Sequence, residues 1–364
     1  MMTQARTRIY LDHAATTPMR PEAIAAVADG MARWANPSSP HAEGRAARAA
    51  LEEARARIKA SLGWDGELIF TSGASEALWI ALNRAKVARR IVSAVEHDAV
   101  FRAAPGAEVV PVGADGTVDL TRLEESLKGV GPAIISVQHV NSETGIMQPI
   151  DEIAPLVRAS GHVLIADCAQ SAGKQPLPDA DLIVVSAHKL GGPPGIGALL
   201  VRELGLLDPV GGQEFGYRAG TENLPGALGF AAALDAGNLV STWPHSYALI
   251  DAAHRLEVFV QSAGGGVLGN ESPRSMLIRS IAMPGVTAAA QLIQLDQAGF
   301  AVSAGSACSS GTLKQSRVLQ ALGLKDEVAA TMIRVSIGWS TTVDELNAFA
   351  ASWLKIAHEA ARRA

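Results

Sequence analysis

The chain has 364 residues, of which 48% are apolar and 18% charged, and its formal net charge is −5. This length is enough for one large domain plus a smaller one, and the charge argues against a protein that binds nucleic acid or an anionic membrane surface. We expect a soluble cytoplasmic protein, because residues 1–8 lack the apolar core of a signal peptide, no apolar run could cross a bilayer, and the 2 cysteines do not suggest a disulfide framework.

Helical and strand patterns alternate from about residue 45 to residue 240. Residues 45–62 are rich in Ala, Glu and Arg, with apolar residues at helical spacing. Apolar strands are predicted at 67–71, 90–93, 133–137, 162–166 and 182–185, with helical stretches between several of them. Strands separated by helices predict an α/β fold with a mainly parallel sheet that is covered on both faces.

The pattern changes after about residue 240. Helical stretches at 248–262, 287–297 and 346–362 alternate with short strands at 274–282 and 332–337. This order predicts a smaller α+β C-terminal domain, which the extreme N-terminal segment is expected to join. We therefore predict a large domain over residues 15–240 and a small domain over residues 241–364 together with residues 1–14.

Lys189 and Asp167 stand at the ends of two predicted strands. The strand at 182–185 leads to Lys189 and a glycine-rich turn, and the strand at 162–166 ends in Asp167. Pyridoxal phosphate requires such a pair, because the lysine forms a Schiff base and the aspartate keeps the pyridine nitrogen protonated. Taken singly, each is explained equally well as a surface lysine or a turn aspartate.

Residues 71–77 form a candidate phosphate site where a strand leads into a helix. Free backbone N–H groups and the helix dipole attract an anion there, and Ser75 adds a hydroxyl group. The alternative is an ordinary helix cap, for which serine is a common residue. Ser186 and His188, which flank Lys189, are candidates for the same phosphate.

Three other polar side chains, His97, Asn141 and Gln170, follow predicted strands. An imidazole at a strand end is suited to stack on a pyridine ring and to move protons near neutral pH, although a lone histidine is more often structural. Turn formation explains Asn141 equally well, and a solvated polar side chain explains Gln170.

The two cysteines lie in different sequence contexts. Cys168 directly follows Asp167 and is predicted to be a small packed side chain. Cys308 lies in a run of small residues, 304–311, which is typical of an exposed loop and favours a reactive thiol. No Cys/His spacing fits a structural zinc site, so no metal is expected.

Arg334 places a guanidinium group inside the apolar strand at 332–337. A buried arginine needs an anionic partner. A substrate α-carboxylate bound by two hydrogen bonds is one candidate partner, and an internal carboxylate is the other.

These candidates belong to a series of short segments whose order and spacing extend over nearly the whole chain. The segments are residues 10–18, 36–41, 44–45, 71–76, 96–97, 141–145, 167–170, 173–174, 186–189, 218–223, 305–309 and Arg334. Together they resemble the cysteine desulfurases of the class V aminotransferase family, which have the pyridoxal-phosphate fold type I. The loop at 304–311 resembles the long-loop subgroup that serves iron–sulfur cluster assembly and nitrogen fixation.

The resemblance implies pyridoxal 5′-phosphate as the cofactor and a set of residues that contact it. These are Ala74, Ser75, His97, Asn141, Asp167, Gln170, Ser186, His188, Lys189 and, from the partner subunit of a homodimer, Thr221. Lys189 would hold the cofactor, Asp167 would contact the pyridine nitrogen, and His97 would stack on the ring and act in catalysis.

The resemblance also implies a reaction and its partners. Arg334 and Asn141 would bind the substrate L-cysteine, and Cys308 would attack its sulfur, which leaves a persulfide on the enzyme and releases alanine. The expected partners are a second subunit with a shared active site and a sulfur acceptor protein, such as an iron–sulfur scaffold.

Two other functions stay open on the sequence. A selenocysteine lyase or an aminotransferase of the same fold is one, although an aminotransferase has no evident use for Cys308. A non-catalytic sulfur-delivery protein is the other, and the presence of Lys189 and Asp167 argues against it. The chain departs from the family pattern at Ser75, where threonine is frequent, at Pro194, where lysine is common, and at Trp339, where a basic residue is common.

Overall fold

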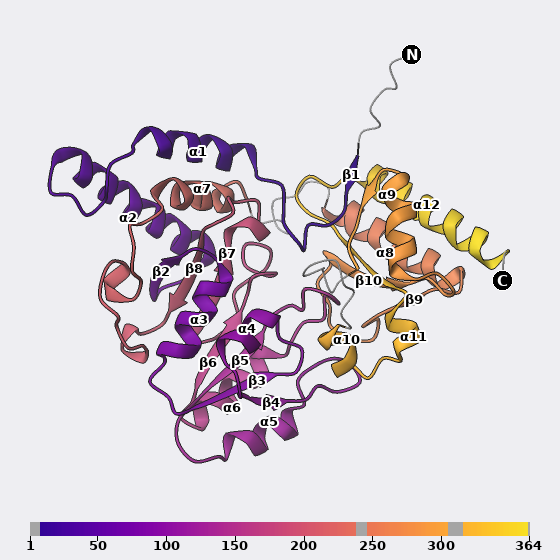
Figure 1. The fold of residues 1–364 in the computed structure, drawn as a ribbon, viewed down its shortest axis with the longest axis horizontal. Helices are drawn as coiled ribbons and strands as arrows, with labels where there is room; N and C mark the ends of the chain where they lie inside the picture. Colours follow the sequence, from indigo (N-terminus) through magenta and orange to yellow (C-terminus); the bar gives the residue numbers. More distant parts are fainter. Residues whose placement is uncertain (1–7, 238–245, 305–315, 363–364) are drawn as a thin grey trace.

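The computed structural model describes residues 8–237, 246–304 and 316–362. Within these ranges no helix has both the length and the apolar character needed to cross a membrane. Two bodies make up the fold: a large one built on a seven-stranded sheet, and a C-terminal one built on two small sheets (Figure 1).

The large sheet has the strand order β2-β8-β7-β6-β5-β3-β4. Its strands are β2 (Glu67–Thr71), β3 (Arg89–Ser93), β4 (Glu108–Val110), β5 (Ala133–Gln138), β6 (Val163–Asp167), β7 (Leu182–Ser186) and β8 (Gly197–Val201). The strands from β4 to β7 in this order are parallel, whereas β8 is antiparallel to both of its neighbours. β8 runs back because only a short connection follows β7, and parallel neighbours need a longer crossover.

Seven α-helices accompany this sheet in the described ranges: α1 (Pro21–Ala32), α2 (Ala42–Leu62), α3 (Ala74–Arg84), α4 (Asp98–Ala103), α5 (Leu120–Leu127), α6 (Ile150–Ala159) and α7 (Leu224–Asp235). Short 3-10 helices lie at η1 (Ala187–Lys189), η2 (Leu204–Leu206) and η3 (Glu214–Gly216). Alternate residues of β2 face opposite layers: Leu68 and Phe70 belong to a core that also holds residues of α2, α5, α6 and α7, whereas Ile69 belongs to a core that holds residues of α3 and α4. The predicted α/β sheet with two covered faces is therefore confirmed.

The C-terminal body has its own core. Its three-stranded sheet has the order β12-β10-β9, with β9 (Gly266–Val267), β10 (Ile278–Ala282) and β12 (Met332–Ser336). Around it lie α8 (Ser246–Ser262), α9 (Ala288–Gln297), α10 (Arg317–Ala321), α11 (Asp326–Ala329) and α12 (Val343–Ala361). The strand predicted at 274–282 is wrong in its first half, because Ser275 accepts the Leu277 N–H through its hydroxyl group and closes a turn there.

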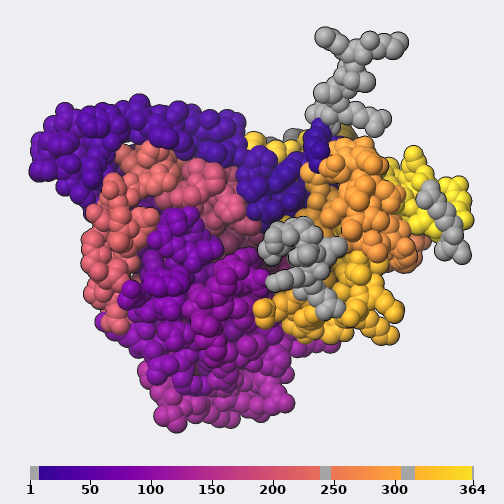
Figure 2. All heavy atoms as spheres, in the orientation of Figure 1, coloured from indigo at the N-terminus to yellow at the C-terminus, as the bar shows by residue number. Residues whose placement is uncertain are grey.

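The N-terminal segment joins this C-terminal body. β1 (Ile9–Tyr10) pairs in parallel with β11 (Phe300–Ala301), and Leu11 is fully buried in the C-terminal core. Figure 2 shows the N-terminal residues, in indigo, at the junction of the two bodies. The boundaries predicted for the two domains stay a prediction, although the two separate cores agree with a division of this kind.

Candidate active site

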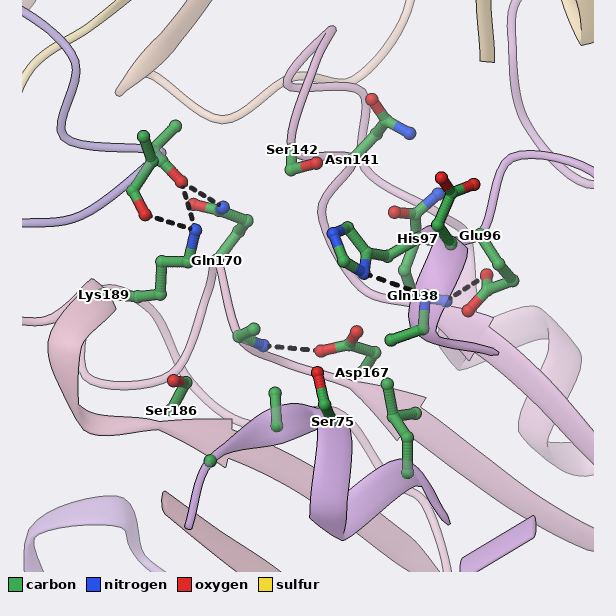
Figure 3. A pocket seen from close by; sticks show the side chains of 18 of the residues that line it. Ser75, Glu96, His97, Gln138, Asn141, Ser142, Asp167, Gln170, Ser186 and Lys189 are labelled. Carbon is green, nitrogen blue, oxygen red and sulfur yellow. Dashed lines mark hydrogen bonds between the residues drawn. The ribbon is translucent and has the colours of Figure 1, made fainter. Parts of the chain in front are cut away.

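A cavity of about 750 Å³ lies at the carboxyl ends of β3, β5, β6 and β7, where α3 begins. Residues of the C-terminal body, among them Ser316 and Arg334, complete its wall. Ten of the residues singled out in the sequence line it: Ala74, Ser75, His97, Asn141, Asp167, Gln170, Ser186, His188, Lys189 and Arg334. Lys189, Asp167, His97 and Ser75 surround a common space in Figure 3.

Lys189 is held by the backbone of the N-terminal turn. It ends η1, immediately after β7, and its Nζ donates to the carbonyl oxygens of Ala14 at 2.5 Å and Ala15 at 2.8 Å. Burial, and then the positive charge of Arg334, lower the pKa of Lys189 to about 8. A larger fraction of this amine is therefore neutral near pH 7 than for an ordinary lysine, and the neutral form is the nucleophile.

Asp167 ends β6, the strand next to β7 in the sheet. Its Oδ1 accepts the Ala169 N–H at 2.9 Å, and its Oδ2 has no hydrogen-bond partner among the described residues. Burial raises the pKa of this carboxyl group, and the nearby His97 and Lys189 oppose the rise. The free oxygen is suited to a protonated ring nitrogen.

His97 caps the N-terminus of α4. Its Nδ1 accepts the Ala99 N–H at 3.2 Å, so the proton of the neutral ring is on Nε2. The preceding residue, Glu96, is buried and accepts hydrogen bonds from the Gln138 N–H at 2.7 Å and the Ser93 hydroxyl at 2.8 Å. Glu96 thereby joins the ends of β3 and β5, and burial raises its pKa to about 8.

The N-terminus of α3 is open to a ligand. Gly73 is its N-cap residue, with φ +152, and no side chain caps the helix. Ser75 is therefore not the helix cap, and its hydroxyl group is left at the cavity wall. A Cβ on Gly197 of β8 would lie 2.8 Å from the Gly73 Cα, so the close approach of these two glycines sets where α3 begins.

His188 also lines the cavity. One of its ring nitrogens, Nδ1, lies 3.1 Å from the Thr16 hydroxyl group. Burial, and then the charges of Lys189 and Lys174, lower the pKa of His188 to about 4. At neutral pH this imidazole is uncharged, so it would act as a hydrogen-bond donor to a phosphate rather than as a counter-ion.

The two amide side chains are both engaged by the protein. Asn141 accepts the N–H groups of Glu143 and Thr144 through Oδ1, at 2.9 Å each, so it forms a turn as well as lining the cavity. Gln170 is buried rather than solvated, and its Nε2 donates to the Ala14 carbonyl at 2.9 Å. The Gln170 Oε1 atom is buried and has no partner within the described residues.

Arg334 already has an internal carboxylate partner. Its Nη2 donates to Asp12 Oδ1 at 2.8 Å, and its Nη1 donates to the Ser142 carbonyl at 2.8 Å. Three donor hydrogens of the guanidinium group have no partner among the described residues. Arg334 can thus keep Asp12 and still offer hydrogen bonds to a second anion in the cavity.

Two residues discussed above, Thr221 and Cys168, do not line this cavity. Thr221 is exposed and does not line the cavity of its own chain. Cys308 lies outside the described residues. Cys168 is fully buried, and burial raises the pKa of its thiol, as suits a packed side chain.

Several cavity features were missed in the sequence. Ala14 and Ala15 lie in the segment 10–18 of the resemblance, but backbone carbonyl groups carry no side-chain signal, so their contact with Lys189 was not predicted. Glu143 accepts the Ser316 hydroxyl at 2.6 Å across the cavity, a contact between residues distant in sequence. Of the two family departures beyond Ser75, Pro194 lines the cavity, whereas Trp339 donates its Nε1–H to the Pro18 carbonyl.

Residues 9–349 match the aminotransferase class-V family. The chain is 35% identical over 371 residues to cysteine desulfurase IscS 1 of Archaeoglobus fulgidus, covering 93% of this chain and 94% of that protein. It is 36% identical to a cysteine desulfurase of Frankia sp., covering 93% of this chain and 88% of that one. Among solved structures it resembles a NifS-like protein from Rickettsia africae, with 28% identity, a TM-score of 0.83 and coverage of 96% of this chain and 99% of that one.

Proposed function

Because the chain belongs to the class V aminotransferase family and is a cysteine desulfurase, we propose that its cavity binds pyridoxal 5′-phosphate through Lys189 and that Cys308 accepts the sulfur of L-cysteine. One observation supports this most directly. The Lys189 amine and the free Oδ2 of Asp167 face one cavity from neighbouring strand ends. Such a pair is what this cofactor requires of a protein.

The remaining residues fit the cofactor as well. Its phosphate would lie at the N-terminus of α3, where Gly73 leaves the backbone N–H groups uncovered, with Ser75, Ser186 and His188 around it. Its ring nitrogen would meet Asp167, with His97 against the ring and Asn141 and Gln170 at its edge. When bound, the cofactor supplies an electron sink for the bonds broken at the substrate.

The protein's own groups would carry the proton and sulfur transfers. Arg334 would bind the substrate carboxylate, while Lys189, neutral in part near pH 7, would take the proton from the substrate α-carbon. The Cys308 thiolate would then attack the substrate sulfur, so that the carbon–sulfur bond breaks and a sulfur–sulfur bond forms. The products are L-alanine, which takes up the proton, and a Cys308 persulfide.

The partners belong to the same proposal. Thr221, exposed on its own chain, would complete the phosphate site of a second subunit in a homodimer. The persulfide would pass to an acceptor protein such as an iron–sulfur scaffold. A reducing cytoplasmic location suits an enzyme whose thiol has to return to the reduced state in each cycle.

The direct test is to incubate the purified protein with L-cysteine and to measure alanine and protein-bound persulfide together. We expect equal amounts of both in a single turnover, and neither product from Lys189→Ala, which should also lack the yellow colour of the bound cofactor. Alanine without persulfide would exclude the sulfur-transfer role, and a wild type that stays colourless with added pyridoxal phosphate would exclude the cofactor.

The two cysteines provide a matched comparison. Cys308→Ser should still bind L-cysteine, seen as a change in cofactor absorbance, but should form no persulfide, because the accepting thiolate is missing. Cys168→Ala should stay active within a few-fold, since the Cys168 thiol is buried and its raised pKa keeps it protonated. An inactive Cys168→Ala beside a fully active Cys308→Ser would reverse the assignment.

A further inference from the structure

The turn formed by residues 12–17 contacts two side chains that the proposed function uses, Lys189 and Arg334. Its Asp12 carboxylate binds Arg334, and its Ala14 and Ala15 carbonyl groups bind Lys189.

Three hydrogen bonds hold the turn in place. Tyr10 donates its hydroxyl hydrogen toward the carbonyl groups of Asp12, at 3.1 Å, and Thr16, at 2.8 Å. The Ala14 N–H donates to the Ser336 hydroxyl at 2.9 Å, and Ser336 belongs to β12, the strand of Arg334. The backbone adds a parallel bridge between Asp12 and Ser336, in which the Ser336 N–H donates to the Leu11 carbonyl at 2.8 Å. Asp12 is therefore held near Arg334 by the backbone, and the ion pair does not depend on the two side chains alone.

Arg334 depends on Asp12 for its counter-charge. The Arg334 side chain is 4% exposed and that of Asp12 is 21% exposed. Within the described residues Asp12 is the one carboxylate within ion-pair distance of Arg334. A guanidinium group so deeply buried needs such a partner, and without it the long side chain would be free to turn away from the cavity.

We propose that Asp12 is a positioning residue for substrate recognition: it fixes the plane of the Arg334 guanidinium group so that the remaining N–H donors meet the substrate carboxylate. This inference rests on the proposed function, in which Arg334 binds that carboxylate. The Ser142 carbonyl on Nη1 is the second point of attachment. Because Asp12 and the Ser142 carbonyl already hold the Arg334 side chain in one conformation, substrate binding does not have to supply the free energy for ordering it.

The negative charge of Asp12 and its hydrogen bond to Arg334 affect binding of the substrate carboxylate in opposite directions. Two variants separate these effects. Asp12→Asn keeps an oxygen that accepts from Nη2 but removes the negative charge that repels an incoming carboxylate. Asp12→Ala removes both. If positioning dominates, Asp12→Ala binds L-cysteine about tenfold more weakly, whereas Asp12→Asn stays within about threefold of the wild type.

The experiment compares L-cysteine with cysteamine, which has the same amine and thiol but no carboxylate, as ligands of the holoenzyme. Binding is followed by the change in cofactor absorbance. Arg334→Ala should lose the preference for L-cysteine. Asp12→Ala should reduce that preference about tenfold with cysteamine binding unchanged, and the double variant should match Arg334→Ala, because Asp12 acts only through the arginine.

Each other outcome has a defined meaning. If Asp12→Ala keeps the full preference while Arg334→Ala loses it, the positioning role is refuted and the role of Arg334 stands. If Arg334→Ala keeps the preference, the substrate assignment of the proposed function is itself wrong. Equal losses for both ligands in Asp12→Ala would show a structural role for the turn, and tighter L-cysteine binding would show that charge repulsion dominates; both refute the inference.

Discussion

Two buried carboxyl groups, Glu96 and Asp167, lie close to the same cavity and differ in what their oxygens contact. Glu96 accepts hydrogen bonds from Gln138, Ser93 and, at 3.3 Å, the Ser136 hydroxyl, so the protein uses its acceptor positions. Asp167 accepts one backbone N–H and leaves Oδ2 open. The first carboxyl group therefore joins strands, whereas the second is available to a ligand.

Glu96 should make the stability of the protein depend on pH. Burial raises its pKa from an ordinary value of 4.5 to about 8. Between these pH values the folded state keeps the Glu96 proton and the unfolded state loses it, so the contribution of Glu96 to the free energy of unfolding falls as pH rises. Glu96→Gln does not ionise. We expect its stability relative to the wild type to improve from pH 5 to pH 8 in urea titrations.

A constant difference between Glu96→Gln and the wild type at the two pH values would contradict this. It would mean that Glu96 titrates alike in the folded and unfolded states.

For single residues, the sequence predicts which side chains belong to the site better than it predicts which backbone groups do. Lys189, Asp167 and His97 were predicted because each follows an apolar strand, and all three line the cavity. The pairing of Arg334 with Asp12 rather than with a ligand alone was left open, because sequence does not show which of two anions lies within reach. The carbonyl groups that hold Lys189 could not be predicted, since every residue has one.

The position of the α3 N-terminus depends on a close contact with β8. Gly197 in β8 lies against Gly73, and a Cβ on Gly197 would come within 2.6 Å of the Val185 carbonyl oxygen and 2.8 Å of the Gly73 Cα. These are backbone atoms, so they cannot yield without moving a strand or the helix. The position of the α3 N-terminus, where the proposed phosphate site lies, is thus set by packing between β7, β8 and α3.

Gly197→Ala should therefore weaken both the fold and cofactor binding. We expect a loss of about 1–3 kcal/mol in the free energy of unfolding, as for other overpacked sites, and a higher dissociation constant for pyridoxal phosphate. Gly205→Ala is the control: a Cβ there meets nothing within 4 Å, and it should change stability by less than about 0.5 kcal/mol. Similar behaviour of the two variants would refute the packing argument.

Among the helices, α2 has a clear apolar period and was predicted, whereas α7 is largely buried and was not. α2 was predicted from its apolar spacing, and Leu51, Ala54 and Ile58 are all fully buried in it. α7 was not predicted, because nine of its twelve residues are buried and no polar face marks the helical period. β8 was also not predicted. Its five residues are all buried and directly follow a glycine-rich turn, so the sequence does not show where the turn ends and a strand begins.

For the whole molecule, the exposed position of Thr221 motivates a test of the homodimer. A carboxylate at this position should repel a phosphate dianion, so Thr221→Asp should bind the cofactor poorly. A mixed dimer of Thr221→Asp and Lys189→Ala would have one site with intact Lys189 and intact Thr221. We expect co-expression to restore about a quarter of wild-type activity if subunits pair at random, although neither variant is active alone.

The control for this experiment is the double variant Thr221→Asp/Lys189→Ala paired with the wild type. In such a dimer each site carries one lesion, so the purified mixed dimer should be inactive. Absence of activity in verified mixed dimers of the two single variants would show that Thr221 does not complete the partner's site.

The pairing of β1 with β11 determines how late in synthesis of the chain the site can be assembled. The Ala14 N–H reaches Ser336, 322 positions later, and residues 9 and 10 reach residues 300 and 301. The carbonyl groups that hold Lys189 therefore take their places only when a ribosome has made most of the sequence, and contacts of such long range form late in folding. Capture of the cofactor thus follows synthesis of the chain, and nascent fragments cut short before β11 would be unable to assemble a complete site.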